Sequence, residues 1–398
     1  MYNKKMYSLG AQGSVIREIF EYGKARKALI GDENVFDFSL GNPSVPAPDC
    51  INETVRRLLD SRDPIALHGY TSSRGDMSTR SAIADDLRRR FDVNVSADDI
   101  IMTLGAAASL SCALGALCED GDEFIVISPF FPEYRVFVEA AGGKLVEVPA
   151  DPDRGFSLDI AALDRAIGPH TKAVIINSPN NPTGRVYSAA EIADLADLLT
   201  RRSSGREPIM LISDEPYREL IYGDEIYPFV TKYYKNSMVC YSYSKSLSLA
   251  GERIGYLLVC PDADLASEIL AAAAGAARAL GYVCAPSLFQ AVIAECSGAL
   301  SDVSVYDASR KLLSDALWKL GFDFAPPDGA FYLFLRSPSG DADECFRRAR
   351  DHELLLVPSD SFGVKGYLRV SYCTPPEMIE RALPAFEALA RDYGLLGR

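Results

Sequence analysis

Short apolar runs alternate with amphipathic segments through the middle of the chain. From about residue 98 to residue 280, the apolar residues occur first in brief runs and then at spacings of three and four. The runs predict strands at Ile100–Thr103, Phe124–Ser128, Lys144–Val148, Ala173–Asn177, Ile209–Ser213, Met238–Tyr241 and Tyr256–Val259. The spacings predict helices at Ala107–Leu117, Glu133–Ala140, Ile160–Ile167, Ala189–Leu199 and Asp264–Ala277. This alternation is typical of an α/β domain, a mostly parallel sheet sandwiched by helices.

The two ends of the chain follow a different pattern. Residues 1–48 contain a helix-like arm and then a loop rich in proline, and a helix is expected near Cys50–Leu59. After Pro286, further helices accompany two apolar strands, at residues 330–335 and 367–372. We therefore expect a large domain over residues 49–286. A smaller α+β domain is expected over residues 287–398. Residues 1–48 form the N-terminal arm and contribute part of this domain, so that it is built from both chain ends.

Composition restricts the class of partner. The 398 residues carry a formal net charge of −14, which argues against nucleic acid and anionic membrane surfaces as partners. The nine cysteines form no CxxC pair and there are only three histidines, so neither a metal site nor a disulfide framework is expected. The N-terminus leads into no apolar signal region, and we expect a cytoplasmic protein.

Lys245 is the strongest candidate for chemistry. Burial lowers the pKa of a lysine, which leaves a free amine able to attack a carbonyl. Ser242, Ser244 and Arg253 surround it in sequence and are donors suited to a phosphate. A cofactor that carries both an aldehyde and a phosphate fits this combination, namely pyridoxal 5'-phosphate. The alternative on this segment alone is an exposed lysine in a serine-rich loop.

Other candidates also follow predicted strands. Gly105 follows the first strand, and Asn181, Asp214 and Lys245 follow three later ones. In open α/β sheets, ligands bind at the carboxyl ends of the strands. Because independent packing residues have no reason to share one edge, the coincidence favours a ligand site over isolated structural roles.

Two side chains after the strand at 209–213 suit a pyridine ring. A carboxylate at Asp214 can hold a pyridinium proton, and the hydroxyl of Tyr217 can donate to a phenolate oxygen. The alternatives are a helix-capping aspartate and an ordinary half-buried tyrosine. Asn181, in the turn-rich string Pro-Asn-Asn-Pro-Thr-Gly, offers a second donor to the same oxygen.

The remaining candidates frame the same ligand. Ala106 and Ala107 allow a phosphate to approach a helix N-terminus, although close helix–strand packing explains them equally well. Phe131 could stack on a ring, or it could be a core aromatic residue. Arg369 stands inside an apolar strand and could bind a carboxylate, with Gly41 closing over it; the alternative is an edge-strand arginine that reaches solvent.

These strings together resemble the class I/II aminotransferases, the pyridoxal-phosphate enzymes of fold type I related to aspartate aminotransferase. The resemblance runs from Gly41 to Arg369, with the motifs Asn-Asn-Pro-Thr-Gly, Asp-Glu-Pro-Tyr and Ser-x-Ser-Lys in the family's order. It implies that Lys245 binds the cofactor covalently and moves the substrate's α-proton. It also implies a homodimer with shared active sites, because Tyr70 matches a tyrosine that reaches the neighbouring subunit's phosphate.

The resemblance assigns the other residues to three groups. The ring is held by Asp214, Tyr217, Asn181 and Phe131, the phosphate by Ser242, Ser244, Arg253, Ala106 and Ala107, and the substrate by Arg369, Gly41 and Asn181. Three points are notable in comparison with the family. The stacking position is Phe131 rather than Trp or Tyr. Ala106 and Ala107 replace polar side chains common in the phosphate loop. Arg278 is the only basic residue between residues 262 and 309 that could serve a second substrate carboxylate.

We expect an aminotransferase that exchanges an amino group between an L-amino acid and a 2-oxo acid. A carbon–sulfur β-lyase on the same scaffold is the alternative, because the same residues labilise the α-proton. A DNA-binding regulator with this fold is disfavoured, because only some forty residues precede Gly41 and the chain is acidic.

Overall fold

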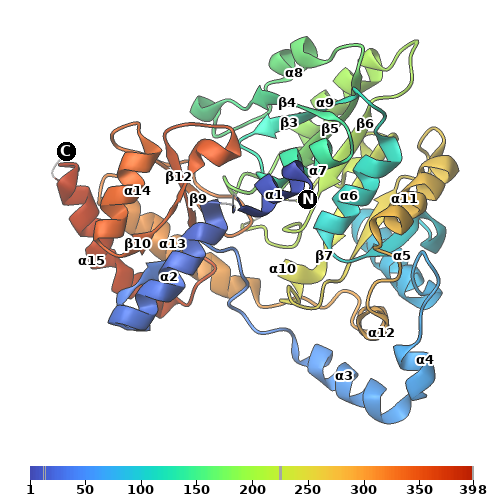
Figure 1. The fold of residues 1–398 in the computed structure, drawn as a ribbon, viewed down its shortest axis with the longest axis horizontal. Coiled ribbons are helices and arrows are strands. Elements are labelled where there is room, and N and C mark those ends of the chain that lie inside the picture. Colours follow the sequence, from blue (N-terminus) through green and yellow to red (C-terminus); the bar gives the residue numbers. More distant parts are fainter. Residues whose placement is uncertain (12, 14, 224–225, 397–398) are drawn as a thin grey trace.

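A seven-stranded sheet forms the centre of the larger body of the protein. The computed structural model describes residues 1–11, 13, 15–223 and 226–396 (Figure 1). The strands lie in the order β2-β8-β7-β6-β5-β3-β4, and all are parallel except β8, which runs antiparallel to both of its neighbours. Their bounds are β2 Ile100–Thr103, β3 Glu123–Ser128, β4 Lys144–Pro149, β5 Thr171–Asn177, β6 Met210–Asp214, β7 Ser237–Ser242 and β8 Gly255–Val259. The expectation of a mostly parallel sheet is confirmed.

Successive residues of the inner strands enter two different cores. On β5, Ile175 lies in one hydrophobic cluster, whereas Val174 and Ile176 lie in the other. The helices that cover the first face are α6 (Ala106–Leu117), α7 (Glu133–Ala140) and α11 (Ala266–Leu280). The second face is covered by α5 (Met77–Phe91), α8 (Ile160–Ala166), α9 (Ala189–Arg202) and α12 (Ser287–Glu295). Because both faces are covered, the strands read as continuous apolar runs.

A smaller body is built from both ends of the chain, as expected. Its antiparallel sheet has the order β11-β12-β9, and β1 near the N-terminus pairs in parallel with β10. The bounds of its elements are α2 Val15–Ile30, β1 Phe36–Asp37, α13 Val303–Lys319, β9 Tyr332–Arg336, α14 Ala342–Asp351, β10 Leu354–Leu355, β11 Val357–Pro358, β12 Tyr367–Ser371 and α15 Pro376–Asp392. Figure 1 shows the blue helix α2 lying against the orange and red elements of this body.

Helix α12 packs with the larger body. The sequence-based boundary at residue 286 assigns it to the C-terminal domain, but Val292 and Ile293 are buried in the same cluster as Ile83 and Leu87 of α5. Its other neighbours are α3 (Asp49–Ser61) and α4 (Pro64–His68). The chain therefore crosses to the smaller body after α12, at the start of α13.

The first helix, α1 (Lys4–Ala11), contacts the larger body. It precedes α2, which packs on the smaller body, and Lys5 Nζ donates to the carbonyl oxygen of Glu139 at the end of α7, 3.0 Å away. Figure 1 shows α1 between the two bodies. Within the described part of the chain, no helix combines the length and apolar character that a membrane crossing requires.

Candidate active site

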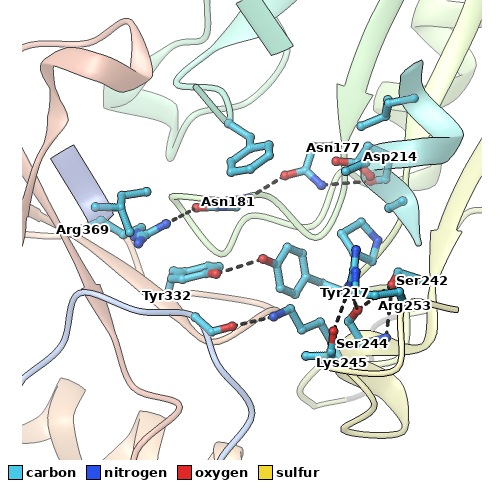
Figure 2. Close-up of a pocket in the computed structure, with 18 residues that line it drawn as sticks. Asn177, Asn181, Asp214, Tyr217, Ser242, Ser244, Lys245, Arg253, Tyr332 and Arg369 are labelled. Atoms are coloured by element: carbon cyan, nitrogen blue, oxygen red, sulfur yellow. Dashed lines mark hydrogen bonds between the residues drawn. The ribbon is translucent and has the colours of Figure 1, made fainter. Parts of the chain in front are cut away.

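The candidate residues line one cleft at the carboxyl ends of the parallel strands. Figure 2 shows side chains from β5, β6 and β7 meeting side chains from the smaller body. The residues that line the cleft are Ile16, Gly41, Ala106, Ala107, Leu110, Phe131, Asn177, Asn181, Asp214, Pro216, Tyr217, Ser242, Ser244, Lys245, Ala250, Arg253, Tyr332 and Arg369. The structure thus brings together every site residue expected from the sequence except Tyr70.

One end of the cleft is an anion cradle. Helix α6 begins at Ala106, so its free backbone N–H groups face the cleft. Arg253 lies opposite, with Nη1 3.4 Å from Ser244 Oγ and Nη2 3.0 Å from the carbonyl oxygen of Leu104. Gly105 has φ +94°, and a Cβ there would lie 2.8 Å from Arg253 Nη2. Glycine is therefore required both for the turn and for the space beside the guanidinium.

A buried carboxylate lies at the end of β6. Tyr134 on α7 donates to Asp214 Oδ2 at 2.5 Å, whereas Asp214 Oδ1 has no hydrogen-bond partner among the described residues. Burial raises the pKa of Asp214 from 3.8 to about 7, the bond from Tyr134 opposes that rise, and Glu215 adds to it. Asp214 lines the cleft, so its unpaired oxygen can accept one hydrogen bond from a ligand.

Lys245 projects into the cleft from α10 (Tyr243–Ser246), the single turn that follows β7. Its Nζ donates to the carbonyl oxygen of Gly41 at 2.5 Å and lies 5.5 Å from the ring centroid of Phe331. The pKa of Lys245 is lowered to about 8, chiefly by burial and also by the charges of Arg253 and Arg369, while Cys373 opposes the fall. Near neutral pH a larger fraction of this amine is therefore unprotonated than in an ordinary lysine, which favours a role as nucleophile or base.

A chain of hydrogen bonds connects the backbone carbonyl group of Asp214 with the arginine of the smaller body. Arg369 Nη1 donates to Asn181 Oδ1 at 3.0 Å, and the Asn181 N–H donates to Asn177 Oδ1 at 2.7 Å. Asn177 Nδ2 donates in turn to the carbonyl oxygen of Asp214 at 2.9 Å. Arg369 is only 2% exposed, and its Nε has no partner in the described part of the chain, so a donor remains for a ligand carboxylate.

Tyr217 contacts Tyr332, a residue that the sequence analysis did not single out. Its hydroxyl lies 2.9 Å from that of Tyr332, and the guanidinium carbon of Arg369 lies 4.6 Å from the Tyr332 ring centroid (Figure 2). A Cβ on Gly41 would lie 2.0 Å from the Tyr332 hydroxyl, which explains why glycine stands at position 41. Burial raises the pKa of Tyr217 well above its ordinary value, so this hydroxyl remains protonated and can donate.

Two residues named from the sequence lie outside this cleft. Tyr70 is 98% exposed, and Arg278 is exposed on α11; neither is among the cleft-lining residues. Sequence reasoning missed Ile16, Asn177, Tyr134 and Tyr332. Asn177 ends a predicted strand and Tyr134 lies in a predicted helix, but neither was assigned a role in the site. No local signal pointed to Ile16 or Tyr332, because other elements bring them to the cleft.

The chain matches a family of known proteins over most of its length. Residues 33–386 match the model for aminotransferase class I and II. An aspartate aminotransferase of Thermotoga maritima is 30% identical over 94% of this chain and 96% of its own length. An aspartate/prephenate aminotransferase of Thermus thermophilus is 30% identical over 87% of this chain and 88% of its own. A solved amino transferase from Eubacterium rectale is 52% identical over 99% of both chains, with a TM-score of 0.96.

The buried carboxylate predicts how ligand-free stability depends on pH. Because the folded state raises the pKa of Asp214 from 3.8 to about 7, ionisation destabilises the fold, and the stability present at lower pH is lost as pH rises towards 7. Between pH 5 and 7, the free energy of unfolding of the wild type should fall by roughly 2–3 kcal/mol more than that of Asp214→Asn. Urea unfolding of the ligand-free proteins at both pH values measures this difference. Asp194→Asn, at an exposed carboxylate on α9, is the control. If the free energy of unfolding depended on pH equally in the two variants, the prediction would be contradicted.

Proposed function

The chain belongs to the class I and II aminotransferases, and on that premise we propose which of its residues transfer the amino group. The family relationship establishes a pyridoxal-phosphate-dependent transaminase. The β-lyase alternative is not favoured, because the relatives are named for amino-group transfer. The observation that carries the proposal is the presence in one cleft of the Lys245 amine, the free oxygen of Asp214 and the guanidinium of Arg369.

The residues of the cleft fit pyridoxal 5'-phosphate. The unpaired Asp214 Oδ1 suits the pyridinium N–H, and the cradle beside Gly105 suits the phosphate, which Ser242, Ser244, Arg253 and the start of α6 would hold. Phe131 lines the same cleft and would stack on the ring. When bound, the cofactor supplies an aldehyde for the substrate amine and an electron sink for the bond that breaks at the α-carbon.

Lys245 performs the proton transfer in this proposal. Its lowered pKa, to about 8, makes the amine a competent acceptor of the substrate's α-proton near neutral pH. The carbonyl oxygen of Gly41 accepts a hydrogen bond from Nζ and so fixes the position of the amine. Tyr217 and Asn181 lie where they could donate to the ring's phenolate oxygen, and Arg369 would bind the substrate's α-carboxylate through its planar fork.

The first test is the half-reaction with single L-amino acids. We expect the cofactor absorption to change from the aldehyde form to the amine form with at least part of a broad amino-acid panel. Lys245→Ala should lose this conversion by roughly 10²–10⁴-fold, the usual contribution of a positioned base. Borohydride should leave a mass-shifted adduct on Lys245 of the wild type only. The control is Lys144→Ala, at an exposed lysine on β4. No conversion with any amino acid would contradict the proposed function.

The second test concerns the carboxylate that faces the ring. Tyr134→Phe removes the donor that lowers the pKa of Asp214, so this carboxylate should become both more basic and less firmly oriented. A hydrogen bond to a charged group contributes about 1.5–3 kcal/mol, and we expect the cofactor dissociation constant to rise at least about tenfold. Tyr234→Phe is the matched control, because that hydroxyl donates to Ile209 at the opposite end of β6. Equal cofactor affinity in both variants would contradict a role for Tyr134.

We propose that the enzyme is a homodimer whose active sites are shared. Tyr70 and Ile65 are 98% and 84% exposed, and Val283 on the adjacent loop is 42% exposed. The two loops lie together, since Cys284 Sγ donates to the carbonyl oxygen of Thr71 at 3.3 Å. A second copy of the chain would cover this apolar patch. Tyr70, which does not line the cleft of its own chain, would then reach the phosphate of the neighbouring subunit.

Mixing two inactive variants tests the shared site. Lys245→Ala and Tyr70→Ala should each lose activity as pure preparations. In a mixed dimer, one of the two sites receives both an intact Lys245 and an intact Tyr70. After unfolding and refolding together, about a quarter of all sites should therefore be complete. Recovery of activity towards that level is expected, and failure to exceed the sum of the separate preparations would contradict the sharing of Tyr70.

A further inference from the structure

The hydroxyl groups of Tyr332 and Tyr217 form a buried contact to which no role has been assigned. Their oxygens lie 2.9 Å apart, and the two residues are 2% and 6% exposed. Tyr217 follows β6 of the larger body, whereas Tyr332 begins β9 of the smaller body. Both side chains are already covered within one chain, so this contact does not depend on the surface that a neighbouring subunit would cover.

The register of the smaller sheet places Tyr332 beside Arg369. Tyr332 pairs with Ser371 on β12, and Arg369 lies two residues before Ser371. Because alternate residues of a strand point to the same face, Tyr332 and Arg369 are diagonal neighbours on one face of the sheet. The guanidinium carbon of Arg369 accordingly lies 4.6 Å from the centroid of the Tyr332 ring. A cation beside a phenol favours its ionised form, so it makes the hydroxyl a stronger hydrogen-bond donor.

Both hydroxyl groups carry their hydrogen near neutral pH. Burial raises the pKa of Tyr332 to about 12, Arg369 opposes that rise, and Cys373 adds to it. Burial also raises the pKa of Tyr217 well above its ordinary value, and the contact with Tyr332 adds to the rise. The charge of Asp214 raises the pKa of Tyr217 as well, whereas Arg369 lowers it. One of the two hydrogens lies between the two oxygens, and the other is free to point to a ligand.

The surroundings of Tyr332 indicate which hydroxyl donates to the other. Among the described residues, the hydroxyl of Tyr332 has no hydrogen-bond partner other than Tyr217. Gly41 lies so close to this hydroxyl that a Cβ at position 41 would collide with it. With Arg369 over its ring, Tyr332 is the stronger donor, and the acceptor within its reach is the oxygen of Tyr217. Tyr217, in the turn after the buried carboxylate, then keeps its own hydrogen for the cleft.

We propose that Tyr332 is a positioning residue for the cofactor, because it donates to the oxygen of Tyr217 and so directs the hydrogen of Tyr217 towards the phenolate oxygen. This inference rests on the proposed function, in which Tyr217 donates to that oxygen. Hydrogen bonds in a chain polarise one another, so a hydroxyl that accepts from Tyr332 becomes a stronger donor itself. The phenolate oxygen is thereby stabilised in its ionised form. The smaller body thus influences the cofactor through Tyr332 without touching its phosphate.

Tyr332→Phe tests the direction of this hydrogen bond. The substitution removes the hydroxyl and keeps the ring, which packs edge-on against Tyr217 with 5.6 Å between the centroids. The readout is the absorption of the bound cofactor titrated against pH, whose midpoint reports the loss of the proton held next to the phenolate oxygen. We expect the midpoint to lie about 0.5 to 1 pH unit higher than in the wild type, as the loss of one hydrogen bond implies. A lower midpoint would mean that Tyr217 donates to Tyr332, and either a lower or an unchanged midpoint would overturn the proposal.

Tyr222→Phe is the matched control for the loss of a buried hydroxyl. Tyr222 belongs to the same hydrophobic cluster as Tyr332, and its hydroxyl donates to the carbonyl oxygen of Ala330, two residues before Tyr332. Tyr222 does not line the cleft. The midpoint of Tyr222→Phe should therefore equal that of the wild type. Circular dichroism checks that each variant folds.

A double-mutant cycle tests whether Tyr332 acts through Tyr217. Tyr217→Phe alone should raise the midpoint by more than Tyr332→Phe does. Adding Tyr332→Phe to Tyr217→Phe should raise it no further, because the hydroxyl on which Tyr332 acts is then absent. A second rise as large as the first would overturn the assignment of Tyr332 as a positioning residue. A wild-type protein that binds no pyridoxal 5'-phosphate would instead refute the proposed function.

Discussion

The structure depends on how it accommodates charge at the end of β6. Asp214 and Glu215 are adjacent and both buried, but their surroundings differ. Glu215 has a full counter-charge, since Arg218 Nη1 lies 3.0 Å from its carboxylate and the same guanidinium also contacts Glu219 and Tyr256. Each carboxylate has one oxygen without a partner among the described residues, but Asp214 has no counter-charge, only the hydroxyl of Tyr134, and it lines the cleft. The ion pairs of Arg218 therefore engage Glu215 within the protein. The carboxylate of Asp214, in contrast, remains available to a ligand.

Because of this arrangement, a bound ligand contributes to the stability of the fold. Groups that are buried without partners destabilise the protein alone, and a ligand that pairs with them stabilises it in proportion to its binding. Asp214, Lys245 and Arg369 face one space, and in the described part of the chain no ion pair joins them. Binding of the proposed cofactor and substrate carboxylate would therefore offset the destabilisation that comes from burying these three groups.

The sequence predicted well those features that are local in the chain. Strands such as β2 were found within a residue or two of their ends, and the rule that ligands bind at strand ends located Asn181, Asp214 and Lys245 in one cleft. Helix α5 was missed because it is rich in charged residues, and its buried positions include Thr79 and Arg80, which the hydrophobic pattern does not mark. Propensity and periodicity do not register burial that is achieved through polar tertiary contacts.

The anchoring loop that carries Lys245 and Arg253 begins and ends at the same sheet edge, because β8 reverses direction after β7. Tyr243 N–H donates to the carbonyl oxygen of Ile254 at 3.1 Å and closes this loop at its base. The spacing of the two proposed cofactor contacts is thus set within a dozen residues, whereas Ile16, Gly41 and Arg369 reach the cleft from the other body. The proposed cofactor contacts of this loop therefore do not depend on how the two bodies are placed, whereas the proposed contacts to the amino acid do.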